Sequence, residues 1–226
     1  MINVWCVCVG DKYGEEDVRI LRNMIDRHLS LPHDFYVLSD RQRGDFNCII
    51  PDEKWPGWWS KLLLFRYAFG QVLYLDLDVV VVGSLDYLIS EQLSMAANWA
   101  QSGHGGCQSS VMSWHADHDA YFNLVKEFDL DQLGKPDPNG NCPHYGLYNG
   151  LWGDQEYITQ KLGDPGSGKV KKASGIYSYK YHCRDKGLPD DAAVICFHGY
   201  PKPSEVSETW VKVARSSTAI LGSNTK

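Results

Sequence analysis

The chain has 226 residues, 43% of them hydrophobic and 22% charged, which is a globular composition and excludes a fibrous or disordered protein. With 28 acidic residues against 22 basic ones, its formal net charge of -6 argues against a nucleic-acid-binding surface. The 8 tryptophans and 13 tyrosines are numerous for this length and can form stacking platforms for sugar rings or bases. The length predicts a single domain, which we place at residues 1–215, followed by a frayed polar tail at 216–226.

Cellular location is predicted from the termini and the cysteines. Residues 1–9 are apolar but lack a basic n-region, so we expect a buried strand there and not a signal peptide. No apolar run reaches the roughly 20 residues that a membrane-spanning helix needs. The 7 cysteines are odd in number and irregularly spaced, which favours free thiols in a reducing compartment. We therefore expect a cytoplasmic protein with no transmembrane segment.

The first part of the chain alternates apolar strands with helices. Strands are predicted at residues 2–9, 35–38, 48–50, 72–75 and 79–82, and helices at 15–29 and 58–69. This alternation is typical of an α/β fold, a Rossmann-like, mostly parallel sheet flanked by helices. Ligands of such sheets bind beyond the carboxyl ends of the strands.

The second part is less regular. Strands are predicted at residues 93–99, 107–114 and 192–197, and helices at 117–128, 154–162 and 206–213. Residues 130–150 are rich in glycine and proline and predict a long surface loop. Loops of this size in compact domains are usually functional, so we expect the acceptor side of any site here.

Asp76 and Asp78 follow the strand predicted at 72–75. Buried carboxylates are costly unless they are paired or bound to a metal. At positions i and i+2 of an extended chain they point the same way, and such oxygen ligands suit Mg²⁺ or Mn²⁺, which in turn bind nucleotide phosphates. The simpler alternative is an acidic turn, because Asp-x-Asp pairs are common by chance.

A second polar segment, residues 197–203, follows the strand predicted at 192–197. Gly199 lets the backbone approach a ligand closely, Lys202 is a compact charge suited to phosphate, and His198 could ligate a metal through a neutral ring nitrogen. A proline-stabilised surface turn with a solvated lysine is the alternative.

Asp154, Gln155 and Glu156 open the helix predicted at 154–162. Asp154 would cap this helix and Glu156 would complement its dipole. The same position allows Asp154 and Gln155 to contact a sugar hydroxyl or an anomeric carbon.

These segments, taken in order with Gly10–Tyr13, Ser60–Leu62 and Gln108–Met112, form a recurring pattern over roughly residues 2–204. The pattern resembles the GT-A-fold glycosyltransferases that use nucleotide sugars, and most closely glycosyltransferase family 8, the glycogenin and galactosyltransferase group. The resemblance implies a GT-A fold and a nucleotide-sugar-dependent activity.

The resemblance also implies a role for each matching residue. Those that would hold Mn²⁺ or Mg²⁺ are Asp76, Asp78 and His198. Those that would bind the nucleotide-sugar donor are Tyr13, Lys61, Asp76, Asp78, Gly199 and Lys202. The catalytic residues, near the transferred sugar and the acceptor, would be Asp154 and Gln155. Within the donor site, Gly199 and Lys202 would contact the diphosphate and Tyr13 would face the base.

The chain departs from the family pattern at three places. The family histidine lies three residues before the glycine, where this chain has Cys196; His198 lies on the same strand face and could replace it. Residues 108–110 read Gln-Ser-Ser where the family has Asn-Ser-Gly, and Ser204 stands where a tryptophan usually follows Lys-Pro.

The predicted reaction transfers a sugar from a UDP-linked donor to the hydroxyl of a saccharide or other acceptor. The metal and Lys202 would offset the charge on the leaving diphosphate. Retention at the anomeric carbon is what the family likeness implies, whereas an inverting enzyme would need a carboxylate base, which Asp154 could supply.

Two other functions stay open at this level. A metal-dependent nucleotidyltransferase or pyrophosphorylase would also join a nucleotide-binding sheet to acidic residues, but residues 10–14 are too sparse in glycine and basic residues for its phosphate loop. A non-catalytic carbohydrate-binding protein could use tryptophans as platforms, namely Trp55, Trp58, Trp59 and Trp99. Such a protein would not need Lys202 beside an acidic cluster.

Overall fold

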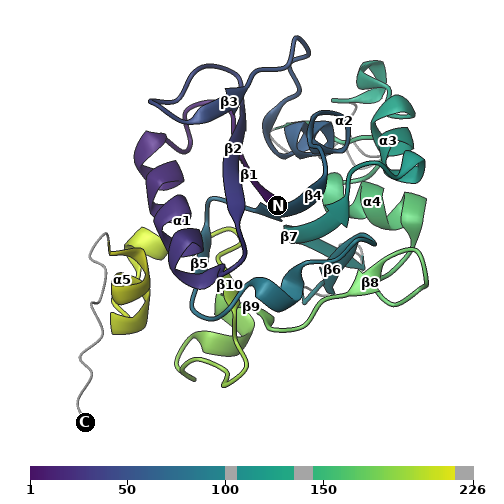
Figure 1. The fold of residues 1–226 in the computed structure, drawn as a ribbon. Helices are drawn as coiled ribbons and strands as arrows, with labels where there is room; N and C mark the ends of the chain where they lie inside the picture. The colour runs from purple at the N-terminus through teal and green to yellow at the C-terminus, as the bar shows by residue number, and fades with distance from the viewer. Residues whose placement is uncertain (100–105, 135–144, 217–226) are drawn as a thin grey trace.

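A seven-stranded sheet forms the centre of the computed structural model, which describes residues 1–99, 106–134 and 145–216 (Figure 1). Its strands, in sheet order, are β3 (Asn47–Ile49), β2 (His33–Ser39), β1 (Ile2–Cys8), β4 (Gln71–Leu75), β7 (Cys107–His115), β6 (Ser94–Ala97) and β8 (Lys171–Lys172). Neighbouring strands run parallel from β3 to β4 and between β6 and β8, whereas β7 is antiparallel to both β4 and β6. The predicted α/β fold with a mostly parallel sheet is confirmed.

A second, smaller sheet joins segments that are far apart in the sequence. Its central strand, β10 (Val194–Cys196), pairs antiparallel with β5 (Val79–Val81) and parallel with β9 (Ile176–Ser178). The register places Cys196 opposite Val79. The segment after Asp78 and the segment before His198 are therefore neighbours in space.

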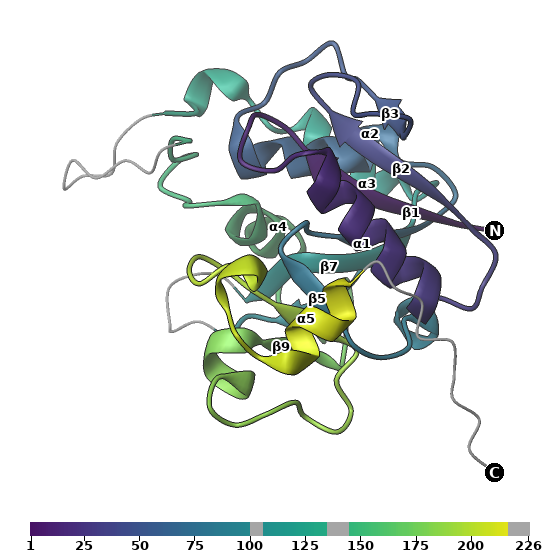
Figure 2. The same cartoon turned by 90° about the vertical axis from the view of Figure 1, so that its left-hand side faces the viewer.

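Helices cover the sheet on both sides. They are α1 (Glu15–His28), α2 (Leu64–Tyr67), α3 (Asp119–Lys126), α4 (Asp154–Leu162) and α5 (Thr209–Arg215). Helices α1 and α5 lie side by side on one face, and α2, α3 and α4 lie on the other (Figures 1 and 2). No helix in the described part of the chain is both long and apolar enough to cross a membrane.

The alternation of side chains along β1 divides the interior into two cores. Val4 and Cys6 contribute to the core under α1, whereas Trp5 packs on the opposite side with the residues around α2, α3 and α4. Successive strand residues point to opposite faces, so a strand covered on both faces needs an unbroken apolar run. The apolar sequence of residues 2–9 has this physical basis.

The predicted helix at 58–69 takes a different form. Residues Gly57–Leu63 wind as a 3₁₀ helix, and only Leu64–Tyr67 form an α-helix. Residues 59–63 are all buried, so the segment has no polar face and lacks the 3.6-residue amphipathic pattern that favours an α-helix. Lys61 is one of the buried residues of this segment, as described below.

Other predictions differ in detail. The last predicted helix, 206–213, is displaced to Thr209–Arg215, and the region between α4 and β10 contains elements the sequence pattern did not predict: β8, β9 and a π-helical turn at Tyr179–Cys183. In the predicted 130–150 loop, residues Leu130–Gln132 form a 3₁₀ turn, and residues 135–144 lie outside the described residues. The predicted tail also lies outside them from residue 217 onward.

Candidate active site

A pocket of about 410 Å³ lies at the carboxyl ends of β1 and β4, where ligand sites of α/β sheets are expected. Every site residue predicted from the sequence lines it: Tyr13, Lys61, Asp76, Asp78, Asp154, Gln155, His198, Gly199 and Lys202. These residues come from loops after β1, β4 and β10, from the 3₁₀ helix, and from the first turn of α4. The fold therefore brings together side chains that are widely separated in the sequence.

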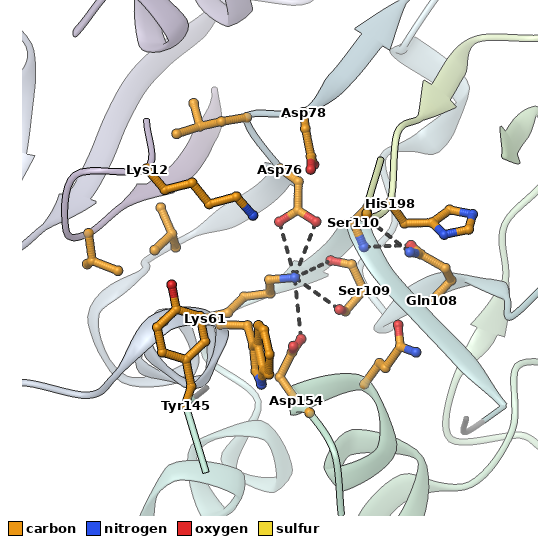
Figure 3. Close-up of a pocket in the computed structure, with 18 of the residues that line it drawn as sticks. Lys12, Lys61, Asp76, Asp78, Gln108, Ser109, Ser110, Tyr145, Asp154 and His198 are labelled. Carbon is orange, nitrogen blue, oxygen red and sulfur yellow. Dashed lines mark hydrogen bonds and ion pairs between the residues drawn. The ribbon is translucent and has the colours of Figure 1, made fainter. Parts of the chain in front are cut away.

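Lys61 lies at the base of this pocket and is buried (Figure 3). Its Nζ is 3.1 Å from Asp76 Oδ1 and 3.4 Å from Asp154 Oδ2. It also donates a hydrogen bond to Ser109 Oγ, at 3.0 Å. Burial alone would lower the pKa of the Lys61 ammonium, but the carboxylates of Asp154 and Asp76 outweigh burial and raise it. One buried cation thus forms ion pairs with two acidic side chains.

Asp154 is the more deeply buried of the two acids that contact Lys61, with 4% of its surface exposed. Burial raises the pKa of its carboxyl group, and the opposing effect of Lys61 does not fully compensate. The capping role expected from the sequence belongs to another residue, because Gly153 is the N-cap of α4 and Asp154 is its first helical residue. Glu156 Oε2 accepts a hydrogen bond from the Trp152 backbone N–H at 2.6 Å, which holds the chain entering the helix.

Asp78 forms a separate group nearer the solvent. Its Oδ2 accepts hydrogen bonds from Lys202 Nζ at 2.6 Å and from the Tyr13 hydroxyl at 2.9 Å. Burial, followed by the Asp78 charge, raises the pKa of Tyr13, so its hydroxyl keeps its proton and donates it. Asp76 in turn accepts a hydrogen bond from the Tyr74 hydroxyl and is bound through its backbone N–H to the Ser110 carbonyl, at 2.8 Å. Asp76 and Asp78 thus each form an ion pair with a different lysine and accept a hydrogen bond from a different tyrosine.

His198 lines the pocket but its ring points away from the two aspartates (Figure 3). Its Nε2 lies 2.6 Å from Ser178 Oγ, and its ring stacks on Trp99 and Tyr181, with centroids 6.1 and 5.6 Å away. Burial, followed by the charge of Lys180, lowers the pKa of His198 and favours the neutral imidazole.

The fit of this site to a metal ion rests on the two aspartates. Carboxylate oxygens are the ligands that Mn²⁺ and Mg²⁺ prefer, and Asp76 and Asp78 present them at one edge of the pocket (Figure 3). Within residues 1–99, 106–134 and 145–216, no group of three or more His, Cys, Asp or Glu side chains is arranged to hold a metal ion. The assignment of His198 as a third ligand stays a prediction.

Glycine is required at position 199, which follows His198. Its φ of +71° lies in the left-handed region, and a Cβ there would be 3.0 Å from Lys180 Nζ. The backbone of this loop can therefore lie close to a ligand bound beside Lys202.

In the strand segment Gln108–Ser110, which stands where the glycosyltransferase pattern described above has Asn-Ser-Gly, the polar groups bond to one another. Gln108 Oε1 accepts a hydrogen bond from the Ser110 backbone N–H at 2.7 Å, and Gln108 Nε2 donates to Ser110 Oγ at 2.9 Å. Both side chains are buried in the pocket wall. The segment thus offers a rigid polar wall next to Lys61.

Lys12 was not among the residues predicted from the sequence, although it lines the same pocket. Its exposed side chain points toward Asp76 (Figure 3), and its Nζ lies 5.1 Å from the centroid of the Tyr13 ring, with Lys202 Nζ 5.9 Å from that centroid. Desolvation of its ammonium group in the pocket, followed by the charge of Lys202, lowers the pKa of Lys12. Two ammonium groups near one tyrosine ring form a site suited to a polyanion. A basic residue in the loop after a strand that ends at the pocket was the signal available in the sequence.

Solved glycosyltransferases share this fold. The galactosyltransferase LgtC, in complex with donor and acceptor sugar analogues, is 18% identical over 89% of this chain and 88% of its own, with a TM-score of 0.55. GlyE of Streptococcus pneumoniae TIGR4 is 15% identical over 94% of this chain, with a TM-score of 0.61, and the bifunctional WbbM is 13% identical over 89%, with a TM-score of 0.56. This chain spans 60% of the GlyE chain and 46% of the WbbM chain.

The sequence itself matches no family model and no curated protein. At 13–18% identity the structural likeness concerns the fold, and it confirms the GT-A architecture predicted from the sequence.

Proposed function

We propose that this protein is a glycosyltransferase that moves a sugar from a UDP-linked nucleotide sugar to the hydroxyl group of an acceptor. The observation that carries the proposal is the convergence of every predicted site residue on one pocket at the carboxyl ends of β1 and β4. The fold adds support, because the similar structure of LgtC holds donor and acceptor sugar analogues.

The donor diphosphate would bind at the Lys12 and Lys202 side of the pocket. Breaking the bond between the anomeric carbon and the diphosphate leaves additional negative charge on the departing phosphate oxygen. Lys202, held 2.6 Å from Asp78, can exchange that partner for a phosphate oxygen and stabilise the charge as it develops. Lys12 would add a second positive charge from the loop after β1.

A divalent ion, Mn²⁺ or Mg²⁺, would be held by Asp76 and Asp78 and would supply further positive charge beside the diphosphate. His198 would serve as a third ligand only if its ring exchanged Ser178 for the metal.

Asp154 and Gln155 would lie beside the transferred sugar. The first turn of α4 brings both side chains to the pocket, and Lys61 neutralises part of the Asp154 charge. Asp154 would stabilise positive charge that develops at the anomeric carbon and would orient the sugar hydroxyls. Transfer with retention of the anomeric configuration remains part of this proposal.

A cytoplasmic location is also proposed. The described cysteines are all free thiols, namely Cys6, Cys8, Cys48, Cys107, Cys183 and Cys196, and all of these but Cys48 are buried. Proteins that keep free cysteines usually work in a reducing compartment.

The proposal is tested by incubating the protein with a panel of nucleotide sugars in Mn²⁺, in Mg²⁺ and in EDTA. Release of UDP that requires a divalent ion is the expected result, and the proton NMR spectrum of the product gives its anomeric configuration. Release of pyrophosphate would instead identify a nucleotidyltransferase. Sugar binding with no turnover of any nucleotide sugar would identify a carbohydrate-binding protein.

A further inference from the structure

Tyr74, the residue before the last one of β4, lines the active-site pocket, yet only 1% of its surface is exposed. A tyrosine as deeply buried as this usually has a hydrogen-bond partner for its hydroxyl group. The partner here is the carboxylate of Asp76, which accepts a hydrogen bond from the Tyr74 hydroxyl. A buried side chain of the central sheet thus contacts a residue of the proposed metal and donor site.

The pairing of β4 with its neighbours brings these two side chains together. Tyr74 lies opposite Trp5 of β1 and Met112 of β7, so strands on both sides hold its backbone. Beyond the end of β4, the Asp76 backbone N–H still donates to the Ser110 carbonyl, at 2.8 Å. Side chains two positions apart on an extended chain point to the same face. The contact between Tyr74 and Asp76 is therefore set by the sheet.

Tyr74 also contacts the cation that pairs with Asp76. Lys61 Nζ lies 5.5 Å from the centroid of the Tyr74 ring and 3.1 Å from Asp76 Oδ1. The ring attracts the ammonium group, while the hydroxyl donates to the carboxylate. Burial, followed by the charge of Asp76, raises the pKa of Tyr74, so its hydroxyl keeps the proton that it donates. Tyr74 thus contacts both members of this buried ion pair.

The orientation of the Asp76 carboxylate matters because 22% of this side chain is exposed and faces the pocket. A carboxylate that rotates freely must be ordered when it binds a ligand, and this ordering costs free energy. Hydrogen bonds to the rear of a metal-binding carboxylate remove that cost, and loss of such a partner lowers metal affinity by about 10–100-fold. Water does not readily replace the Tyr74 hydroxyl, because Tyr74 is enclosed by the core.

We infer that Tyr74 is a positioning residue of the donor site, whose hydroxyl holds the Asp76 carboxylate in the orientation that binds the divalent ion. The inference rests on the proposed function and adds to it a residue that acts through Asp76. Tyr13 donates to Asp78 in the same way, but Tyr13 is only partly buried. Water can replace the Tyr13 hydroxyl, so the two tyrosines differ in how strongly their aspartate depends on them.

Tyr74→Phe tests the inference, since it removes the hydroxyl and keeps the ring beside Lys61. The affinity of the full chain for UDP is measured by calorimetry in Mn²⁺ and in EDTA. In Mn²⁺ the variant should bind UDP at least about tenfold more weakly than the wild type, and in EDTA the two should bind equally. Tyr157→Phe is the matched control, because Tyr157 is fully buried, donates to the Leu124 carbonyl at 3.0 Å and does not line the pocket. Its UDP affinity should equal that of the wild type in both solutions.

A double-mutant cycle with Asp76→Asn separates positioning from a general effect on the fold. If Tyr74 acts through Asp76, Tyr74→Phe should cause no further loss of UDP affinity in the Asp76→Asn background. A further loss there, or equal affinities of Tyr74→Phe and Tyr157→Phe in Mn²⁺, would overturn the positioning role and leave the proposed function in place. Wild-type affinity for UDP that is the same in Mn²⁺ and in EDTA would count against the metal-dependent function itself, and the inference would fail with it.

Discussion

Two lysine–carboxylate groups lie in one pocket. They differ in how deeply the lysine is buried and in how many carboxylates it contacts. Lys61 has 8% of its side chain exposed and lies between Asp76 and Asp154, whereas Lys202 has 15% exposed and pairs with Asp78 alone. If the Lys61 ammonium moved away, Asp76 and the buried Asp154 would both lose their contact with a positive charge. Lys202 can leave, because Asp78 keeps the hydroxyl of Tyr13 and access to water. The deep group therefore organises the site, and the shallow one is free to exchange partners with a ligand.

The largest effect is expected from Lys61→Met. Removing one partner of a buried ion pair costs about 3–5 kcal/mol because the remaining charge is left uncompensated. We expect the free energy of unfolding in urea at pH 7 to fall by about that amount. The matched variant Lys202→Met should lose less, because Asp78 keeps the Tyr13 hydroxyl as a partner and 16% of its side chain is exposed. Equal losses in the two variants would contradict the distinction between the groups.

Asp154→Asn should act on turnover. The substitution keeps the shape of the side chain and removes its charge, so we expect transfer to fall by about 10²-fold or more with UDP affinity little changed. Near-normal turnover would show that the charge of Asp154 has no part in the reaction.

The same variant has a pH dependence of stability with a definite sign. The pKa of Asp154 is raised in the folded protein by burial, so the folded state holds this proton more tightly than the unfolded chain does. As pH rises from the ordinary carboxyl range through the raised pKa, the wild type should therefore lose stability relative to Asp154→Asn. Urea unfolding of both proteins across this range measures the difference, and a difference that moves the other way would contradict the assignment.

Lys202→Ala should weaken the binding of UDP and leave that of uridine nearly unchanged. A charge-assisted hydrogen bond contributes about 1.5–3 kcal/mol, and only UDP carries the diphosphate. Lys12→Ala should have the same selectivity with a smaller effect, since its side chain is more exposed. Lys212→Ala, on the exposed side of α5, is the control. Equal losses for UDP and uridine in calorimetry would rule out the diphosphate contact.

Tyr13→Phe should have the smallest effect. It removes one hydrogen bond to Asp78, which contributes about 0.5–1.5 kcal/mol net, while the ring stays near the ammonium groups of Lys12 and Lys202. UDP affinity measured by calorimetry should fall by no more than about tenfold. A larger loss would mean that Asp78 depends on the tyrosine as much as on Lys202.

Local patterns in the sequence were sufficient for the strands that bear the site. The apolar run of β1 and the run before Asp76 are each buried on both faces, so their composition indicated strands. The ligand site was predicted from the polar residues that follow these strands. Lys61 and Lys202 were found through spacing and resemblance, and both line the pocket.

The features that the sequence patterns did not predict are set by contacts with residues far away in the sequence. Strand β8 consists of two exposed lysines, and its extended form comes from pairing with β6. Asp154 has the residue type of a cap, but the backbone of Gly153 takes that position. The orientation of the His198 ring follows from Ser178 and two stacked rings, contacts that no local spacing reveals.

The pairing of β10 with β5 has a consequence for biosynthesis. Asp78 and Lys202 are 124 positions apart, and they meet because Cys196 lies opposite Val79 across these strands. A ribosome releases the chain from its N-terminus, so Asp76, Asp78 and Lys61 emerge long before the strand that delivers Lys202. Until β10 docks, Asp78 lacks its ion-pair partner Lys202. A nascent or C-terminally truncated chain lacking residues 192–202 would therefore lack Lys202, and under the proposed function its donor site would be incomplete.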